Sequence, residues 1–184
     1  MDGKCRRCSK REAASGMAYC PMCICELVEK RAQKAIPDTG GKKEVIITCK
    51  EKNSLNCITA RHVLRKIFGR TAKISVAGSA KAGKSRNALW VIPDSADDAA
   101  AGLISSFMSA KPEQKTFNPG IARIFEFVTE KELLAYARAR NLKNAATGKH
   151  DGGWIKASVQ KLQEGHSGII EAMAKAGVKL KELE

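Results

Sequence analysis

The sequence predicts an α/β domain with an open parallel sheet, preceded by a small metal-binding ribbon. Residues 44–49 (EVIITC) form a short β-branched apolar run, which is typical of a buried strand. Residues 54–68 place apolar side chains at helical spacing, and a strand that leads into a helix through a tight turn is the first unit of such a sheet. Two Cys-x-x-Cys pairs near the N-terminus predict the ribbon.

Composition and charge narrow the possible partners. The 184 residues are 43% hydrophobic and only 5% aromatic, which permits a mostly aliphatic core. The net charge is +14, and no Asp or Glu occurs between Lys52 and Pro93. Such a segment attracts polyanions and suits nucleic acid, although a solvated basic face is the plainer alternative. No apolar run reaches the length of a membrane span, so we expect no membrane contact. The N-terminus is polar and the number of cysteines is odd, which predicts a reducing, cytoplasmic setting.

The N-terminal cysteines have the spacing of a zinc ribbon. Cys5 and Cys8 form one pair, and Cys20 and Cys23 form the second. Each pair brings two thiolates to one tetrahedral ion, so we expect a closed zinc site whose metal supplies the folding energy of this short segment. Cys25 is close enough to compete as a ligand, and a redox role of the pairs is the weaker alternative.

The segment after the ribbon divides the chain. Residues 27–36 predict a helix that exposes Lys30, Arg31 and Lys34, and residues 37–41 (PDTGG) read as a linker. We therefore predict a ribbon with its linker helix over 1–36, a linker over 37–41, and the α/β domain over 42–184.

The helix after the first strand has clear end signals. Asn53 or Ser54 can cap its start, and Gly69 ends it. Its predicted buried face consists of Cys57, Ala60, Leu64, Ile67 and Phe68.

Residues 72–77 predict the second strand, and residues 78–85 (GSAKAGKS) then match the Walker A pattern. A working phosphate loop must open a helix, whereas residues 89–92 are strand-like here and Pro93 prevents a long helix. A loop between two strands fits better, although Lys81, Lys84 and Arg86 could still contact RNA phosphates.

The third strand leads into a helix from about residue 95 to 109. Ser95 can cap it, and Asp97 and Asp98 suit its positive end, with magnesium binding as the alternative role of the two aspartates. The predicted buried stripe is Leu103, Ile104, Phe107 and Met108.

The rest of the chain predicts one more extended segment and three helices. Residues 121–128 are apolar and extended, and residues 129–132 (TEKE) form a capping box that opens the next helix. Two closing helices are expected over 154–164 and 168–183.

Taken together, this order resembles the tRNA 2-thiolation family of PP-loop ATP pyrophosphatases. The resemblance rests on the ribbon, the strand–turn–helix, the Ala96-Asp97-Asp98 helix start and residues 121–137 (IARIFEFVTEKELLAYA), and it covers about residues 5–142. It implies a Rossmann-like sheet of the HUP/PP-loop type, shortened in its middle, and tRNA as a partner.

The ATP turn of this family, Ser-Gly-Gly-x-Asp-Ser, is not kept. The matching positions are Cys49, Lys50, Glu51, Lys52, Asn53 and Ser54, and only the final serine is retained. Glycines let backbone amides approach pyrophosphate, whereas Lys50 and Glu51 place side chains there. No cysteine follows Cys57, so the family's later catalytic cysteines are missing as well. The resemblance therefore implies a non-catalytic second subunit of a wobble-uridine thiolation complex, with chemistry supplied by an active PP-loop thiolase subunit or a second copy of the chain.

Candidate RNA contacts are the basic residues of the segment without acidic residues: Lys52, Arg61, Arg65, Lys66, Arg70, Lys81, Lys84 and Arg86.

Two alternative functions involve sulfur chemistry or nucleotide binding. Cys49 lies beside Lys50 and Lys52 near a helix start, which would lower its pKa and suit a persulfide carrier with Cys57 or Cys25 as resolving partner. A buried strand-end cysteine is the plainer reading of Cys49. Residues 78–85 would make the protein a P-loop nucleotide-binding protein.

Overall fold

The computed structural model describes residues 3–38, 44–49, 51–78, 88–109 and 121–142, together with separate positions between residues 155 and 176. In chain order the elements are α1 (Pro21–Ala35), β1 (Glu44–Thr48), α2 (Leu55–Phe68), β2 (Lys73–Ala77), β3 (Ala88–Ile92), α3 (Ala96–Ser109), β4 (Ile121–Arg123) and α4 (Glu130–Ala139). Within these ranges, no helix combines the length and the apolar character that a membrane crossing requires.

The four strands form one parallel sheet in the order β2-β1-β3-β4, which confirms the predicted parallel α/β architecture. The chain moves from β1 to one side to form β2, and then crosses to the other side of β1 to form β3. The strand order therefore reverses between β1 and β3. In open sheets of this kind, the crevice at the carboxyl ends of the two strands at the reversal is the usual ligand site. Here that crevice lies beside the residues that follow Thr48 and Ile92.

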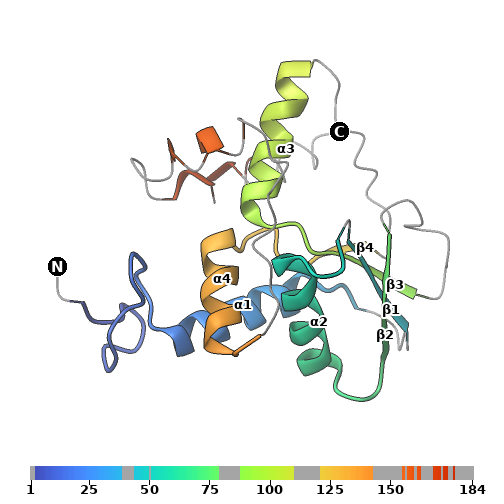
Figure 1. Cartoon of the computed structure of the whole chain (residues 1–184), viewed down its shortest axis with the longest axis horizontal. Helices are drawn as coiled ribbons and strands as arrows, with labels where there is room; N and C mark the ends of the chain where they lie inside the picture. Colours follow the sequence, from blue (N-terminus) through green and yellow to red (C-terminus); the bar gives the residue numbers. More distant parts are fainter. Residues whose placement is uncertain are drawn as a thin grey trace.

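The main core lies between one face of the sheet and three helices. Figure 1 shows α1, α2 and α4 grouped on the same side of the sheet, while α3 extends away from it. Alternate residues of the two central strands are fully buried in this core: Val45, Ile47, Leu89 and Val91. Because side chains alternate across a strand, this set forms one face of the sheet. The helix α1, which leads out of the ribbon, buries Ile24, Val28 and Ala32 in the same core.

Local capping signals act largely as the sequence predicts. Ser54, rather than Asn53, caps α2, since its Oγ accepts from the Cys57 N–H at 3.3 Å, and Gly69 ends this helix with a φ of 59°. Ser95 caps α3 by accepting from the Asp98 N–H at 3.2 Å. Thr129 and Glu132 form the complete capping box that begins α4. These contacts satisfy backbone donors that a helix start leaves without intrahelical partners.

Two predictions about helices are wrong. The helix α1 begins at Pro21, not near residue 27, because proline fits the first helical position and the second cysteine pair continues directly into the helix. In α3, Phe107 and Met108 are 68% and 61% exposed instead of buried, because this end of the helix projects away from the sheet.

Two further predictions about exposure and extension also fail. The Arg31 side chain is only 28% exposed, because it turns toward α4. The extended segment predicted over 121–128 ends early, since β4 stops at Arg123 and a turn follows, with the Val128 N–H donating to the Phe125 carbonyl at 2.9 Å.

Some predicted segments lie outside the described residues. These are residues 39–41 of the linker, residues 79–85 of the Walker-like loop and most of the two closing helices. The division of the chain at residues 36–42 stays a prediction.

Candidate functional site

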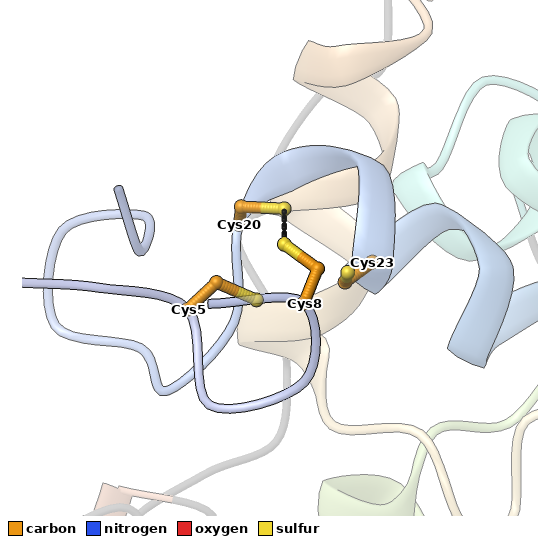
Figure 2. Close-up of side chains that lie close together, drawn as sticks. All are labelled: Cys5, Cys8, Cys20 and Cys23. Atoms are coloured by element: carbon orange, nitrogen blue, oxygen red, sulfur yellow. Dashed lines mark hydrogen bonds between the residues drawn. The ribbon is translucent and has the colours of Figure 1, made fainter. Parts of the chain in front are cut away.

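The four ribbon cysteines converge on one small volume. Cys5 and Cys8 come from the N-terminal loop, Cys20 is the N-cap of α1, and Cys23 lies in its first turn (Figure 2). Their four sulfur atoms all lie within 4.8 Å of one another, and the Sγ atoms of Cys8 and Cys20 are 3.9 Å apart. A tetrahedral ion with metal–sulfur bonds of about 2.3 Å separates its ligands by roughly 3.8 Å. The group therefore fits a single metal ion.

The electrostatics of the ribbon favour thiolates at two of these positions. Although burial works in the opposite direction, N–H donors of Cys20, Cys8 and Arg7 lower the pKa of Cys5 to about 6. The Cys23 N–H is the main group that lowers the pKa of Cys20. Burial and the neighbouring thiols raise the pKa of Cys23 to about 12. A bound cation would supply the charge that lets the remaining thiols ionise.

Backbone contacts hold the ribbon in shape and against the domain. The Cys5 N–H donates to the Arg11 carbonyl at 2.8 Å, and the Arg6 N–H donates to the Ala18 carbonyl at 2.9 Å. The Lys131 Nζ of α4 donates to the Gly16 carbonyl at 2.8 Å. The ribbon is therefore tied to α4 as well as to α1.

Cys25 does not join the four ribbon cysteines. It is buried in the main core, where burial raises the pKa of its thiol and the nearby Arg140 acts in the opposite direction. The competition for metal that its spacing suggests is thus not supported by its position.

The sheet crevice contains a pair of thiols. Cys49 directly follows β1 and is 7% exposed, and Cys57 lies in the first turn of α2 and is fully buried. The neighbouring Cys57, burial and nearby Asp94 raise the pKa of Cys49, so the predicted lowering of its pKa by neighbouring lysines is wrong. The pKa of Cys57 is lowered, chiefly by the neighbouring Cys49.

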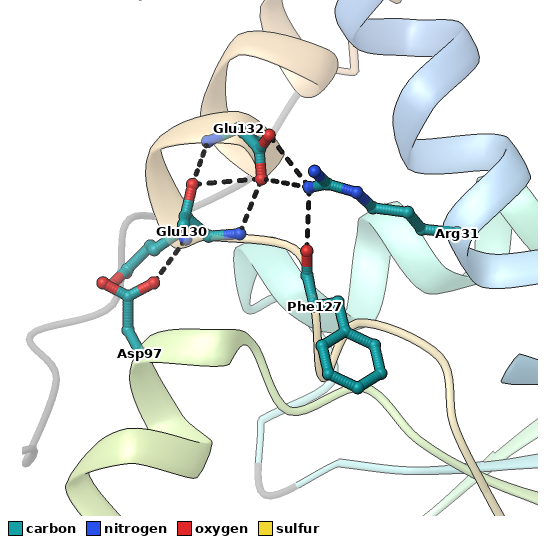
Figure 3. Close-up of polar contacts among 6 residues, drawn as sticks. Arg31, Asp97, Phe127, Glu130 and Glu132 are labelled. Atoms are coloured by element: carbon teal, nitrogen blue, oxygen red, sulfur yellow. Dashed lines mark hydrogen bonds and ion pairs between the residues drawn. The ribbon is translucent and has the colours of Figure 1, made fainter. Parts of the chain in front are cut away.

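The two aspartates at the start of α3 make structural contacts. The Asp98 Oδ2 accepts from the Ser95 N–H at 3.0 Å, from the Ser95 Oγ at 2.7 Å and from the Asn56 Nδ2 at 3.0 Å. The Asp97 Oδ2 accepts from the Glu130 N–H at 2.7 Å, which links the starts of α3 and α4 (Figure 3). These bonds are the chemistry of helix starts, as the simpler sequence interpretation expects.

The predicted RNA contacts divide into three groups. Lys52, Arg61, Arg65 and Arg70 are exposed on and around α2. Lys66 is also exposed, but its ammonium forms an ion pair with Glu29 of α1. Lys81, Lys84 and Arg86 lie outside the described residues, as does Lys50 of the degenerate turn, while Glu51 and Asn53 are exposed and Ser54 caps α2.

A polar cluster between α1, α2 and α4 has no counterpart in the sequence analysis. The Glu29 Oε1 accepts from the Tyr136 hydroxyl at 3.1 Å and from the Arg140 Nη2 at 2.8 Å. The Tyr136 hydroxyl also lies 2.9 Å from His62 Nδ1. Because the hydroxyl donates to Glu29, His62 must donate to its oxygen, which assigns the Nδ1–H form of this histidine. No sequence pattern indicates the cluster, because its members are far apart in the chain.

Comparison with known proteins supports the fold. No protein-family model matches the sequence, and no curated protein matches it significantly. Among solved structures, it is similar to the "U34-tRNA thiolase NcsA from Methanococcus maripaludis with its [4Fe-4S] cluster". The TM-score is 0.77 at 12% sequence identity, and the match covers 99% of this chain and 88% of that one. The chain therefore shares the fold of that structure, which confirms the predicted Rossmann-like α/β fold class.

Proposed function

We propose that this protein takes part in tRNA 2-thiolation as a non-catalytic, tRNA-binding subunit. The observation that carries the proposal is the crevice at the carboxyl ends of β1 and β3, where the strand order of this thiolase-like sheet reverses. There, Glu51 and Asn53 stand in an exposed turn, at the positions where the family that the sequence resembles has glycine and aspartate. Side chains in such a turn prevent the close approach of backbone amides to pyrophosphate. The fold is thus retained while the nucleotide contact is lost.

Exposed basic side chains supply the RNA-binding surface. Around α2 these are Lys52, Arg61, Arg65 and Arg70, and on the ribbon they are Lys4, Arg6, Lys10 and Arg11. Such residues bind phosphates and position an RNA without reading its sequence. Lys66 contributes less than the others, because Glu29 already neutralises its charge. The loop residues Lys81, Lys84 and Arg86 extend this set in our proposal.

The metal of the ribbon is zinc in this proposal. The sulfur spacing suits one ion bound by four thiolates, as in structural zinc sites. An iron–sulfur cluster places its thiolates on separate irons, which requires a wider arrangement. Bound zinc supplies folding energy to the ribbon, while its residues present the basic side chains. We place the protein in the cytoplasm, with an active PP-loop thiolase subunit or a second copy of the chain as partner.

A tRNA-binding assay over a series of salt concentrations tests the proposal. The purified metal-loaded chain is expected to bind tRNA with an affinity that falls steeply as salt rises, because counterions are released from the phosphates. Arg61→Ala combined with Arg65→Ala should weaken binding and reduce the salt slope by roughly 1–2. Lys34→Ala combined with Arg138→Ala removes the same charge from other exposed positions of the chain as a matched control. Absence of binding at moderate salt, or binding without salt dependence, would refute the RNA-binding role.

A nucleotide titration tests the non-catalytic role separately. The proposal expects no ATP binding by calorimetry and no thiolated uridine when the chain alone is supplied with ATP, sulfide and tRNA. Binding that is lost in Lys84→Ala would instead favour the P-loop alternative on residues 78–85. Sulfur transfer by Cys49 receives little support, since this thiol is buried and its pKa is raised.

A further inference from the structure

We propose that Glu29 of α1 competes with RNA phosphate for Lys66 of α2, and that bound RNA draws the Lys66 ammonium away from the Glu29 carboxylate. The inference rests on the proposed RNA-binding role and adds to that surface a residue that limits its affinity. Glu29 is an acidic side chain from the helix that leads out of the ribbon, and it pairs with a cation on the helix that carries the exposed basic residues.

The Glu29 carboxylate binds its partners through two separate oxygens. Its Oε1 accepts from the Tyr136 hydroxyl at 3.1 Å and from the Arg140 Nη2 at 2.8 Å, and both of these partners belong to α4 and its C-cap. Its Oε2 accepts from the Lys66 Nζ. Departure of Lys66 would therefore leave both bonds at Oε1 in place. The Arg140 guanidinium would still neutralise the carboxylate, so the junction between α1 and α4 survives the exchange.

The two partners of this ion pair differ in exposure. The Lys66 side chain is 49% exposed, whereas the Glu29 side chain is only 16% exposed. The lysine ammonium thus borders the solvent, and its flexible stem can turn toward a phosphate without any movement of α2. Arg65, the preceding residue of α2, and Arg70, just beyond the end of this helix, are exposed as well. This end of α2 therefore presents a group of cations to a polyanion.

The exchange should cost the protein little. An ion pair with one exposed partner contributes weakly, so loss of the contact between Glu29 and Lys66 should lower RNA affinity by only about two- to fivefold. The new contact between Lys66 and a phosphate releases counterions from the RNA, which favours binding. Glu29 therefore reduces the contribution of Lys66 to RNA affinity without abolishing it.

A double-mutant cycle with tRNA tests the competition. The metal-loaded full chain is compared with Glu29→Gln, Lys66→Ala and the double variant at moderate salt. Glutamine can keep its amide oxygen on Tyr136 and Arg140, while its amide nitrogen offers Lys66 only donors. Glu29→Gln should tighten tRNA binding by about two- to fivefold. Lys66→Ala should weaken binding more in the Glu29→Gln chain than in the wild type, by the same factor, and should there reduce the salt slope by about 1.

Two controls separate this competition from a general effect of charge or stability. Glu26→Gln removes a carboxylate from the same helix, one turn earlier, whose partner is Arg7 of the ribbon. In this variant, Lys66→Ala should weaken tRNA binding by the same factor as in the wild type. The second control leaves Glu29 unchanged and so does not depend on the folding of its variant. In the otherwise wild-type chain, Lys66→Ala should weaken binding less than Arg65→Ala does.

The outcomes distinguish this inference from the proposed function. Suppose that the wild-type chain binds tRNA, but Lys66→Ala has the same effect with and without Glu29, or weakens the wild type as much as Arg65→Ala does. Either result would overturn the competition and leave the RNA-binding role intact. An equal coupling of Lys66 to Glu26 would also overturn it, since the effect would then be one of overall charge. Absence of tRNA binding by both the wild type and Glu29→Gln would refute the RNA-binding role and the competition with it.

Discussion

The Nη1 atom of Arg31 lies 3.0 Å from both carboxylate oxygens of Glu132, although the two residues are 101 positions apart in the chain. The same nitrogen donates to the Phe127 carbonyl at 2.8 Å (Figure 3). Glu132 at the same time closes the capping box of α4 by accepting from the Thr129 N–H at 2.9 Å. One side chain of the ribbon helix thus supports the start of α4 and the turn that precedes it.

Replacement of this arginine should weaken the junction between α1 and α4. Arg31→Ala leaves a largely buried carboxylate without its cation, and we expect the free energy of unfolding to fall by roughly 2 kcal/mol. Urea unfolding followed by circular dichroism measures the change. Lys34→Ala, on the same helix but exposed, should change it by less than about 0.5 kcal/mol. Equal effects of the two variants would contradict the role of Arg31.

The ribbon should depend on its metal while the sheet does not. Cys20→Ser removes one of the four ligands and should abolish stoichiometric metal binding, measured by elemental analysis. Treatment of the wild type with a chelator should speed hydrogen exchange at the Arg6 amide, which donates to the Ala18 carbonyl. Amides of β1 and β3 should stay protected. Cys25→Ala is the matched control and should retain the metal. Loss of the metal from this variant would show that the ligand set is wrong.

The hydroxyl of Tyr136 should stabilise the fold through two contacts. Tyr136→Phe removes the donor to Glu29 and the acceptor for His62, so we expect a loss of roughly 1–2 kcal/mol in the free energy of unfolding. For comparison, Tyr19→Phe removes a hydroxyl that has no hydrogen-bond partner among the described residues and should have little effect. A thermal shift no larger for Tyr136→Phe than for Tyr19→Phe would contradict the arrangement.

His62 should make stability depend on pH near neutrality. Burial first, and then the positive charges of Arg140 and its neighbours, lower the pKa of His62 below its ordinary value of 6.5. The unfolded chain therefore binds a proton at His62 more readily than the folded chain does. The contribution of His62 to the free energy of unfolding is complete above about pH 6.5 and declines as the pH falls below that value. His62→Gln should flatten the dependence of the urea midpoint between about pH 7.5 and 5.5. An unchanged slope would show that other groups cause it.

Glu29 should cause a second decrease in the free energy of unfolding, at a more acidic pH than His62. Burial opposes its ionisation, but hydrogen bonds from Lys66 and Tyr136 and the charges of Lys66 and Arg140 lower the pKa of this carboxyl below 4.5. The carboxylate thus stabilises the fold above the unfolded pKa, and this contribution is lost as the pH falls through the folded pKa. Glu29→Gln should destabilise the protein at pH 7 and remove the acid step from the unfolding profile. An acid step that remains in the variant would assign it to another carboxyl.

The sequence alone determined the local features of this protein. Helix caps and the Cys-x-x-Cys pairs act over a few residues, so Ser95, Thr129 and Gly69 could be assigned to their roles without a structure, and the cap of α2 could be narrowed to Asn53 or Ser54. The β-branched runs identified β1 and β3, because a fully buried strand carries apolar side chains on both faces.

Only the tertiary structure decided which distant side chains meet. The pairs Arg31–Glu132 and Glu29–Arg140 join positions 101 and 111 residues apart, and nothing in a local pattern selects such partners. The neighbouring Cys57 and burial raise the pKa of Cys49, against the direction that the sequence predicts. Propensity and capping act within one or two turns of chain, whereas burial and charge pairing are set by how the helices pack on the sheet.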